Sequence, residues 1–175
     1  MATNRRELLG GLVGAMAGVA FTGCGLHGAA HAQTPAQAPQ GQRRREVVVN
    51  GKRVRTVDVH AHCHIPEALA LMGQKVNFPA LVVGPERIKA IDEQGIDIEA
   101  LSINPIFWYK VDPDLARQVV KLQNEKLAEI CAKEPDRFVG LASVALQHPE
   151  LAAEQLEEAV KRLGLRGTLI GGSVN

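Results

Sequence analysis

The sequence predicts an α/β fold, the N-terminal half of a (β/α)8 TIM barrel that is truncated before the barrel closes. From Thr56 onward, short stretches rich in Val, Ile and Leu alternate with longer amphipathic stretches, a pattern that builds a parallel sheet through right-handed crossovers. Four strands and three helices are visible before Asn175, whereas a complete barrel needs about 250 residues. The alternative is a small open sheet, but no glycine-rich phosphate loop follows any strand.

Residues 1–32 have the pattern of an export signal. Arg5 and Arg6 precede an apolar run over residues 8–21 that is rich in Gly and Ala, as in cleavable signals. The run is shorter than the ~20 residues that cross a bilayer, so we expect no stable membrane span. The residues around the arginine pair resemble the twin-arginine signal, which carries folded proteins across the membrane.

Small residues at Ala30 and Ala32 provide a cleavage position, so we expect a periplasmic or secreted protein. Cys24 ends a segment that is similar to a lipoprotein box. A lipid anchor at Cys24 is therefore the second alternative, behind cleavage after Ala32.

Residues 33–46 are expected to form a solvated linker. They are rich in Gln, Pro and Ala, have no apolar periodicity and contain the basic triplet Arg43, Arg44 and Arg45, which is typical of linkers. The formal net charge of the whole chain is only +1, and no other basic cluster is present. Because electrostatic binding to nucleic acid needs a strongly basic surface, we expect no nucleic-acid partner.

The barrel domain is expected over residues 47–175 and begins with a hairpin. Asn50-Gly51 lies between two β-branched runs, which is a strong signal for a two-residue turn. The next strand carries His60 and His62, and because side chains alternate along a strand, both imidazoles project from the same face. Two neutral imidazoles can bind one divalent cation, although a zinc-type site takes about three protein ligands. The alternative is a polar pocket that both histidines line.

After the histidine strand, the chain repeats a unit of one helix and one strand three times. Each helix begins with a proline in its first turn, and two of the helices are closed by a glycine, which are common signals for helix ends. In chain order the units are a helix from Pro85 closed by Gly95, a strand over 96–104, a helix from Pro113, a strand over 137–145, a helix from Pro149 closed by Gly164, and a strand over 165–171.

Several spaced motifs follow one another between Val57 and Asn175. They are Val57-Asp58-Val59-His60-Ala61-His62, Arg87-Ile88-x-x-Ile91-Asp92-x-x-Gly95-Ile96, Ala100-Leu101-Ser102, Asn124-x-x-Leu127-Ala128, Pro135-x-Arg137-Phe138-Val139-Gly140-Leu141 and Pro149-Glu150-Leu151-Ala152. In this order they resemble the amidohydrolase superfamily, in the branch of aminocarboxymuconate semialdehyde decarboxylase. The resemblance implies a distorted (β/α)8 barrel that binds one divalent metal, usually zinc, and acts on small acids.

By this resemblance, His60 and His62 match the metal-ligand pair of the first barrel strand, and the implied cofactor is a divalent metal, with Zn2+ expected. The family takes its other ligands and its catalytic histidine from strands five, six and eight, which we do not expect within these residues. The catalytic residues are therefore unknown. The implied partner is a small-molecule substrate.

Phe107 and Trp108 are the candidate substrate contacts. They follow the second predicted strand of the barrel domain, in a loop that helps to wall the substrate pocket in the family that this sequence resembles. The alternative is that both side chains form a hydrophobic plug over the rim of the barrel.

Other polar residues near the histidine pair have more than one interpretation. Asp58 could accept a hydrogen bond from an imidazole, or be only a hydrogen-bonded polar residue of the barrel interior. We expect His64 to lie in a loop near the barrel mouth, because Pro66 indicates that the strand has ended. Cys63 could be a soft ligand, but neighbouring positions on a strand face opposite sides, and we expect no disulfide between Cys63 and Cys131.

Two classes of function stay open. The first is an exported metal-dependent enzyme, a carboxy-lyase or a hydrolase, that acts on a small carboxylated or cyclic substrate. The second is a non-catalytic truncated remnant, or one half of a split enzyme that needs a partner chain. The open edges and apolar inner face of half a barrel predict that the chain forms a homo-oligomer or binds a missing C-terminal half.

The export signal makes the first testable prediction. A reporter that is active only after folded transport, fused behind residues 1–40, is expected to leave the cytoplasm. Substitution of Arg5 and Arg6 by Lys is expected to stop this export, because the twin-arginine route requires the arginine pair. Reporter activity outside the cytoplasm measures the effect. Export that is unchanged by the double substitution would contradict the twin-arginine prediction and would indicate the general secretory route.

Overall fold

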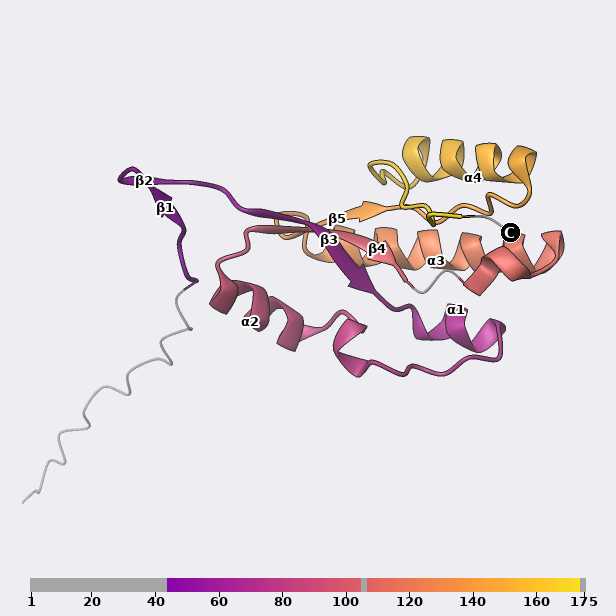
Figure 1. Cartoon of the computed structure of the whole chain (residues 1–175), viewed down its shortest axis with the longest axis horizontal. Coiled ribbons are helices and arrows are strands. Elements are labelled where there is room, and N and C mark those ends of the chain that lie inside the picture. The colour runs from indigo at the N-terminus through magenta and orange to yellow at the C-terminus, as the bar shows by residue number, and fades with distance from the viewer. Residues whose placement is uncertain (1–43, 105–106, 174–175) are drawn as a thin grey trace, which may run out of the picture. The chain divides into compact units, whose positions relative to one another are not determined.

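The computed structural model describes residues 44–104 and 107–173, and its centre is a parallel sheet of three strands (Figure 1). The strands are β3 (Val57–Cys63), β4 (Ile98–Ile103) and β5 (Phe138–Leu141), in the spatial order β3-β4-β5. Both neighbouring pairs are parallel, and helices lie between the strands along the chain. This arrangement confirms the predicted α/β class, and the described residues contain part of a barrel and no closed one.

The predicted hairpin before the sheet is confirmed. Strands β1 (Val48–Val49) and β2 (Lys52–Arg53) pair antiparallel. Asn50 and Gly51 connect them with φ angles of 50° and 75°, the left-handed values that a type I′ turn requires at both central positions.

The helices begin where the sequence signals lie. Helix α2 (Pro85–Gln94) is closed by Gly95, as predicted, with a φ of 80°. Helix α4 (Pro149–Lys161) begins at the predicted proline, but its C-cap is Arg162, so Gly164 lies two residues beyond the cap and does not close the helix. Helix α3 (Pro113–Lys133) is capped by Asp112, whose carboxylate accepts hydrogen bonds from two backbone N–H groups of the first turn. None of the helices in these two described ranges is long and apolar enough to cross a membrane.

Three short helical segments were not predicted. They are α1 (Pro66–Leu71) and the two 3-10 helices η1 (Pro79–Leu81) and η2 (Phe107–Lys110). Each is too short to show the repeated apolar spacing on which the sequence prediction of helices depends.

The last predicted strand does not form a ladder in the described part of the chain. Residues 165–171 contribute one isolated parallel bridge, between Ala142 and Thr168, with a hydrogen bond of 2.7 Å from the N–H of Ala142 to the carbonyl of Gly167. Gly167 has a φ of 146°, which interrupts an extended strand of L-residues. Strand β5 is likewise shorter than the predicted range of 137–145.

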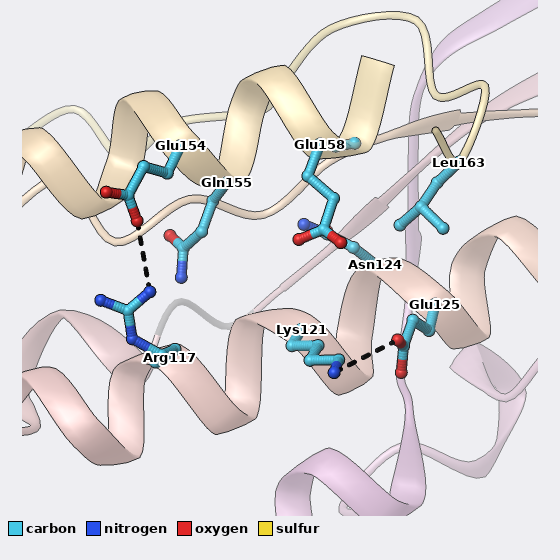
Figure 2. A pocket seen from close by; sticks show the side chains of 9 residues that line it. Arg117, Lys121, Asn124, Glu125, Glu154, Gln155, Glu158 and Leu163 are labelled. Atoms are coloured by element: carbon cyan, nitrogen blue, oxygen red, sulfur yellow. Dashed lines mark hydrogen bonds and ion pairs between the residues drawn. The ribbon is translucent and has the colours of Figure 1, made fainter. Parts of the chain in front are cut away.

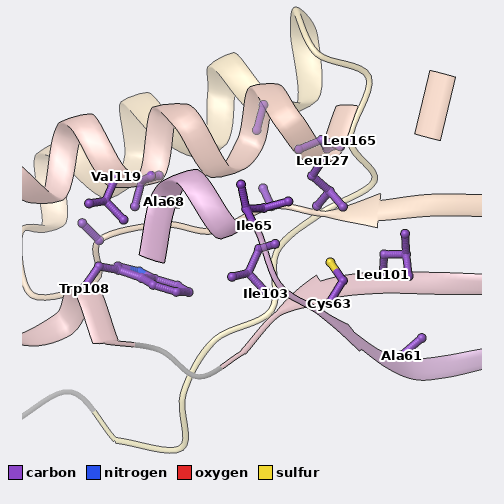
Figure 3. Packing of buried hydrophobic residues seen from close by; sticks show 14 of the residues in the cluster. Ala61, Cys63, Ile65, Ala68, Leu101, Ile103, Trp108, Val119, Leu127 and Leu165 are labelled. Atoms are coloured by element: carbon purple, nitrogen blue, oxygen red, sulfur yellow. The ribbon is translucent and has the colours of Figure 1, made fainter. Parts of the chain in front are cut away.

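Helix α3 covers one face of the sheet and forms the core with it (Figure 3). Cys63 of β3 and Leu101 of β4 are fully buried against side chains of α3 such as Leu127. Gly140 of β5 allows the closest approach, since a β-carbon there would lie only 2.5 Å from Leu165 Cδ2 and 3.1 Å from Leu127 Cγ.

The end of the predicted linker differs from the expectation of a solvated segment. Residues 33–43 lie outside the described residues. Arg44, however, forms ion pairs of 3.1 Å with both Asp92 and Asp97, and the N–H of Arg45 donates to the carbonyl of Asp92. These contacts attach the last linker residues to α2 and to the start of β4.

Asp97, directly before β4, is the centre of a buried polar cluster. Its side chain accepts hydrogen bonds from the Thr56 N–H at 2.8 Å, from the Thr56 hydroxyl, and from the guanidinium groups of Arg44 and Arg53. The backbone hydrogen bond from Thr56, followed by the contacts with Arg53, lowers the pKa of Asp97 from 3.8 to about 2. The cluster therefore joins the hairpin, the start of β3 and the start of β4.

The low pKa of Asp97 predicts a pH-dependent stability. Because the folded state holds the carboxylate ionised, the stabilisation is present above about pH 4 and is lost as the pH falls through about 2. At pH 7, Asp97→Asn is expected to lower the free energy of unfolding by about 2 kcal/mol, measured by urea denaturation. The difference from wild type is expected to shrink toward pH 2.

Asp136, which is exposed, provides the matched control. Asp136→Asn is expected to change the free energy of unfolding by less than about 0.5 kcal/mol. Equal losses in the two variants, or a loss in Asp97→Asn that is the same at pH 7 and pH 2, would contradict this role of Asp97.

Candidate metal centre

The structure brings the two histidines of β3 together. The ring centroids of His60 and His62 lie 4.6 Å apart, with an angle of 75° between the ring planes. Zinc–imidazole bonds are about 2.0–2.1 Å long, so two nitrogens on one cation lie at most about 4.2 Å apart. The separation of the rings is therefore compatible with one cation bound by both. That these histidines are metal ligands stays a prediction.

The approach of the rings coincides with an irregularity in β3. The pairing of β3 with β4 shifts register between Asp58 and Ala61. Asp58 accepts a hydrogen bond of 2.9 Å from the N–H of His60, within this irregular stretch. Of the two interpretations of Asp58, this contact matches the second, a hydrogen-bonded polar residue. Among the described residues, Asp58 accepts no hydrogen bond from an imidazole.

His62 lies in an environment that favours its neutral form. Burial lowers the pKa of His62 below 6.5, and the neighbouring His60 and Arg87 lower it further. A neutral imidazole is the form that binds a cation. The Nδ1 atom of His62 lies 3.1 Å from Ser102 Oγ, on β4.

A buried ion pair fixes the carboxyl end of β3. Arg87 of α2 contacts the carboxylate of Glu99 at 2.9 Å and donates a hydrogen bond of 3.1 Å to the carbonyl of His62. Glu99 is only 3 % exposed, and a buried carboxylate needs such a partner. Sequence reasoning assigned no role to Arg87 or Glu99, although an ionisable residue within a strand as apolar as β4 was an available signal.

His64 does not join the pair. It is buried and forms a bridge with Val82, and its ring centroid lies 6.5 Å from that of Phe78. Neither ring nitrogen of His64 has a hydrogen-bond partner among the described residues. His64 directly follows β3, as expected for a residue beyond the strand end, but its burial was not predicted.

Cys63 is on the opposite side of β3 from the imidazole of His62. It is fully buried in the core beneath α3, and burial raises the pKa of its thiol to about 12. Because its side chain is enclosed in the core on the other face of the strand, Cys63 is not placed to share a cation with the histidine pair. Both Cys63 and Cys131 are free thiols, which confirms that they form no disulfide.

Of the two predicted substrate contacts, Trp108 lies in the core. It is 1 % exposed, and its indole N–H donates a hydrogen bond of 2.9 Å to the carbonyl of Val144. The ring stacks edge-on against Tyr109. This burial matches the hydrophobic plug and leaves no exposed ring face for a substrate. The side chain of Phe107 lies outside the described part of the structure, so its role stays a prediction.

A groove lies between α3 and α4, away from the histidine strand (Figure 2). Its volume is about 160 Å³, and four of its charged residues pair within it, Arg117 with Glu154 at 3.3 Å and Lys121 with Glu125 at 3.9 Å. All of its lining residues follow Val111 in the chain and none belongs to β3. This groove is therefore separate from the histidine pair.

The histidine pair could provide two of the ligands that a metal centre needs. No group of three or more His, Cys, Asp or Glu side chains within residues 44–104 and 107–173 could hold a metal ion. Imidazole ligands bring no negative charge to balance a divalent cation. Two imidazole donors fit part of the ligand set of a mononuclear centre.

Comparisons with known proteins show the family of this chain. The amidohydrolase family profile matches residues 57–175. The chain is 41% identical over 93 residues to gamma-resorcylate decarboxylase of Polaromonas sp. (strain JS666 / ATCC BAA-500). This match covers 53% of this chain and 28% of that protein. It is 33% identical over 90 residues to 2-amino-3-carboxymuconate-6-semialdehyde decarboxylase of Dictyostelium discoideum. This match covers 51% of this chain and 25% of that protein.

A solved structure agrees with these relatives. The dihydroxybenzoic acid decarboxylase from Polaromonas sp. JS666, with bound manganese and the inhibitor 2-nitroresorcinol, has a TM-score of 0.58 and 31% identity, over 67% of this chain and 38% of that one. The chain thus spans about a quarter to two fifths of the length of these proteins. Because the family profile matches from the histidine strand to the last residue, the chain belongs to the amidohydrolase family, in the decarboxylase branch of that superfamily.

Proposed function

We propose that this chain carries the first-strand metal ligands of a carboxy-lyase of the amidohydrolase superfamily. The observation that carries the proposal is the convergence of His60 and His62 on one face of β3, with ring centroids 4.6 Å apart, inside the segment that matches the family. The two similar curated proteins are both decarboxylases by name. Hydrolysis of a small cyclic substrate is the weaker alternative, because it rests only on the wider superfamily.

The proposed substrate is a small carboxylated ring compound. The Polaromonas relative is named for gamma-resorcylate, and the similar solved structure holds a nitro-substituted resorcinol as inhibitor. An aromatic acid of this size suits a site built around one cation. Phe107 remains the proposed contact with the ring.

The proposed cofactor is a divalent cation held by His60 and His62. Imidazole ligands suit Zn2+ and other first-row metals, and the similar solved structure contains manganese, so Zn2+ and Mn2+ are both proposed. The bound cation would supply a Lewis acid that polarises substrate oxygens. The chain's own residues hold and orient the ligands: Asp58 binds the backbone of His60, and Arg87 binds the carbonyl of His62.

A second proposal concerns the assembly of the protein. Strand β3 lies at the edge of the described sheet, and its Val57 and Val59 are 51 % and 74 % exposed. An exposed apolar edge strand is prone to pair with another chain. This supports self-association or a partner that provides the remaining strands, and it keeps open the alternatives of one half of a split enzyme or a non-catalytic remnant.

Export is proposed on the sequence pattern of residues 1–32, which lie outside the described residues. The arginine pair and the cleavage position favour a periplasmic or secreted protein over a lipid anchor at Cys24.

The metal proposal predicts binding that depends on both histidines. The metal-free full chain, titrated calorimetrically with Zn2+ and with Mn2+, is expected to bind one cation loosely, because the described part of the chain offers only the two imidazole ligands of the pair. His60→Ala or His62→Ala is expected to weaken the affinity at least about 10-fold, since each removes half of the ligand set. Binding is also expected to weaken below about pH 6, where protons compete for imidazole.

His148→Ala is the matched control for this titration, since His148 precedes α4 and lies outside the pair. It is expected to leave the affinity unchanged. Absence of metal binding in wild type would favour the non-catalytic remnant. We expect no release of CO2 from 2,6-dihydroxybenzoate by this chain alone. Turnover that is lost in His60→Ala would instead require a complete site within these residues.

The exposed strand predicts the assembly state. Analytical ultracentrifugation of the full chain is expected to show species heavier than the 18.8 kDa monomer. Val59→Lys is expected to shift the distribution toward monomer, because a charge on an edge strand opposes pairing with another chain. A monomeric wild type would contradict self-association.

A further inference from the structure

We propose that Ser102 is a positioning residue for the metal ligand His62, which it holds in the tautomer that leaves Nε2 free to bind the cation. The inference deepens the proposed function and rests on it. Two facts carry it, the contact between Ser102 Oγ and His62 Nδ1 at 3.1 Å and the burial of Ser102, which is 2 % exposed.

The geometry of the sheet makes this contact unavoidable. His62 of β3 and Ser102 of β4 are direct partners in the parallel ladder, so their side chains project from the same face of the sheet at neighbouring positions. The backbone of His62 is held at this point by the hydrogen bond from Arg87 to its carbonyl, and the backbone of Ser102 by its pairing with β3. Ser102 therefore faces the imidazole without any rearrangement.

The two contacts of the Ser102 hydroxyl favour one tautomer of His62. A serine hydroxyl has one proton to donate and two lone pairs to accept with. Ser102 Oγ lies 3.5 Å from the carbonyl of Ala61, which can only accept. If Ser102 donates to that carbonyl, it accepts from Nδ1–H of His62, and both contacts are satisfied. If Ser102 donated to Nδ1 instead, the carbonyl contact would have no proton.

The selected tautomer is the one that a ligand needs. With the proton on Nδ1, the lone pair of Nε2 is available to a cation. Ligand imidazoles commonly donate their second N–H to a fixed acceptor, and loss of that acceptor typically costs about 10–100-fold in metal affinity. Without Ser102, His62 would be free to exchange tautomers and to turn about its side-chain bonds.

The first test needs no variant. In the metal-free full chain with isotopically labelled histidine, at about pH 8, the nitrogen chemical shifts of the His62 ring report which nitrogen carries the proton. Protonated Nδ1 is the expected result, and His62→Gln assigns the signal. Protonated Nε2 as the main form would overturn the proposal.

The second test measures metal affinity. Ser102→Ala is expected to weaken Mn2+ and Zn2+ binding by about 10–100-fold and to populate both tautomers of His62, while Ser102→Thr, which keeps the hydroxyl, is expected to retain binding. Ser143→Ala is the matched control, because Ser143 is also 2 % exposed and its N–H binds Asn124. Unchanged affinity and an unchanged tautomer in Ser102→Ala would overturn the role of Ser102.

The two proposals can fail separately. If wild type binds neither cation, the proposed metal function fails, and the tautomer measurement still decides the role of Ser102. If wild type binds metal and Ser102→Ala binds it equally well, the metal function stands and the positioning role fails.

Discussion

The parallel pairing of β3 with β4 is the interaction on which the rest of the structure depends. At the start of the pair, Asp97 accepts a hydrogen bond from the backbone N–H of Thr56. Arg87 donates to the carbonyl of His62, near the carboxyl end of β3, and to the carboxylate of Glu99, which pairs with Asp58 near the start of the ladder. Ionised side chains that are largely removed from solvent thus hold the start of the ladder and the carboxyl end of β3. One face of this pair forms the core with α3, and the other face carries the histidines.

Because the two faces of the pair differ, neighbouring residues on β3 have different surroundings. Cys63 is fully buried against the helices, while the imidazole of its neighbour His62 meets a hydroxyl on the opposite face. The alternation is a property of extended backbone, so it could be predicted from the sequence. The irregular register between Asp58 and Ala61, which accompanies the close approach of the histidine rings, could not, because it depends on how two separate strands match in length.

The sequence predicted best those features whose cause is local. The starts of α2 and α3 and the end of α2 depend on Pro85, Asp112 and Gly95. Each of these residues acts on the backbone within one turn, so these helix ends could be predicted from the local sequence. Features that depend on partners far away in the sequence could not be predicted. The indole N–H of buried Trp108 donates to the carbonyl of Val144, 36 positions away, and Ser102 contacts His62 across 40 positions. The ion pairs of Arg44 likewise join it to Asp92 and Asp97, 48 and 53 positions away.

Gly140 has a consequence for how the next layer packs on the sheet. A β-carbon at this position would lie 2.5 Å from Leu165 Cδ2 and 3.1 Å from Leu127 Cγ. Both atoms belong to side chains, so a larger residue at position 140 would push Leu165 and Leu127 away from β5. The segment after α4 and helix α3 therefore both owe their close contact with this strand to the absence of a side chain at one position.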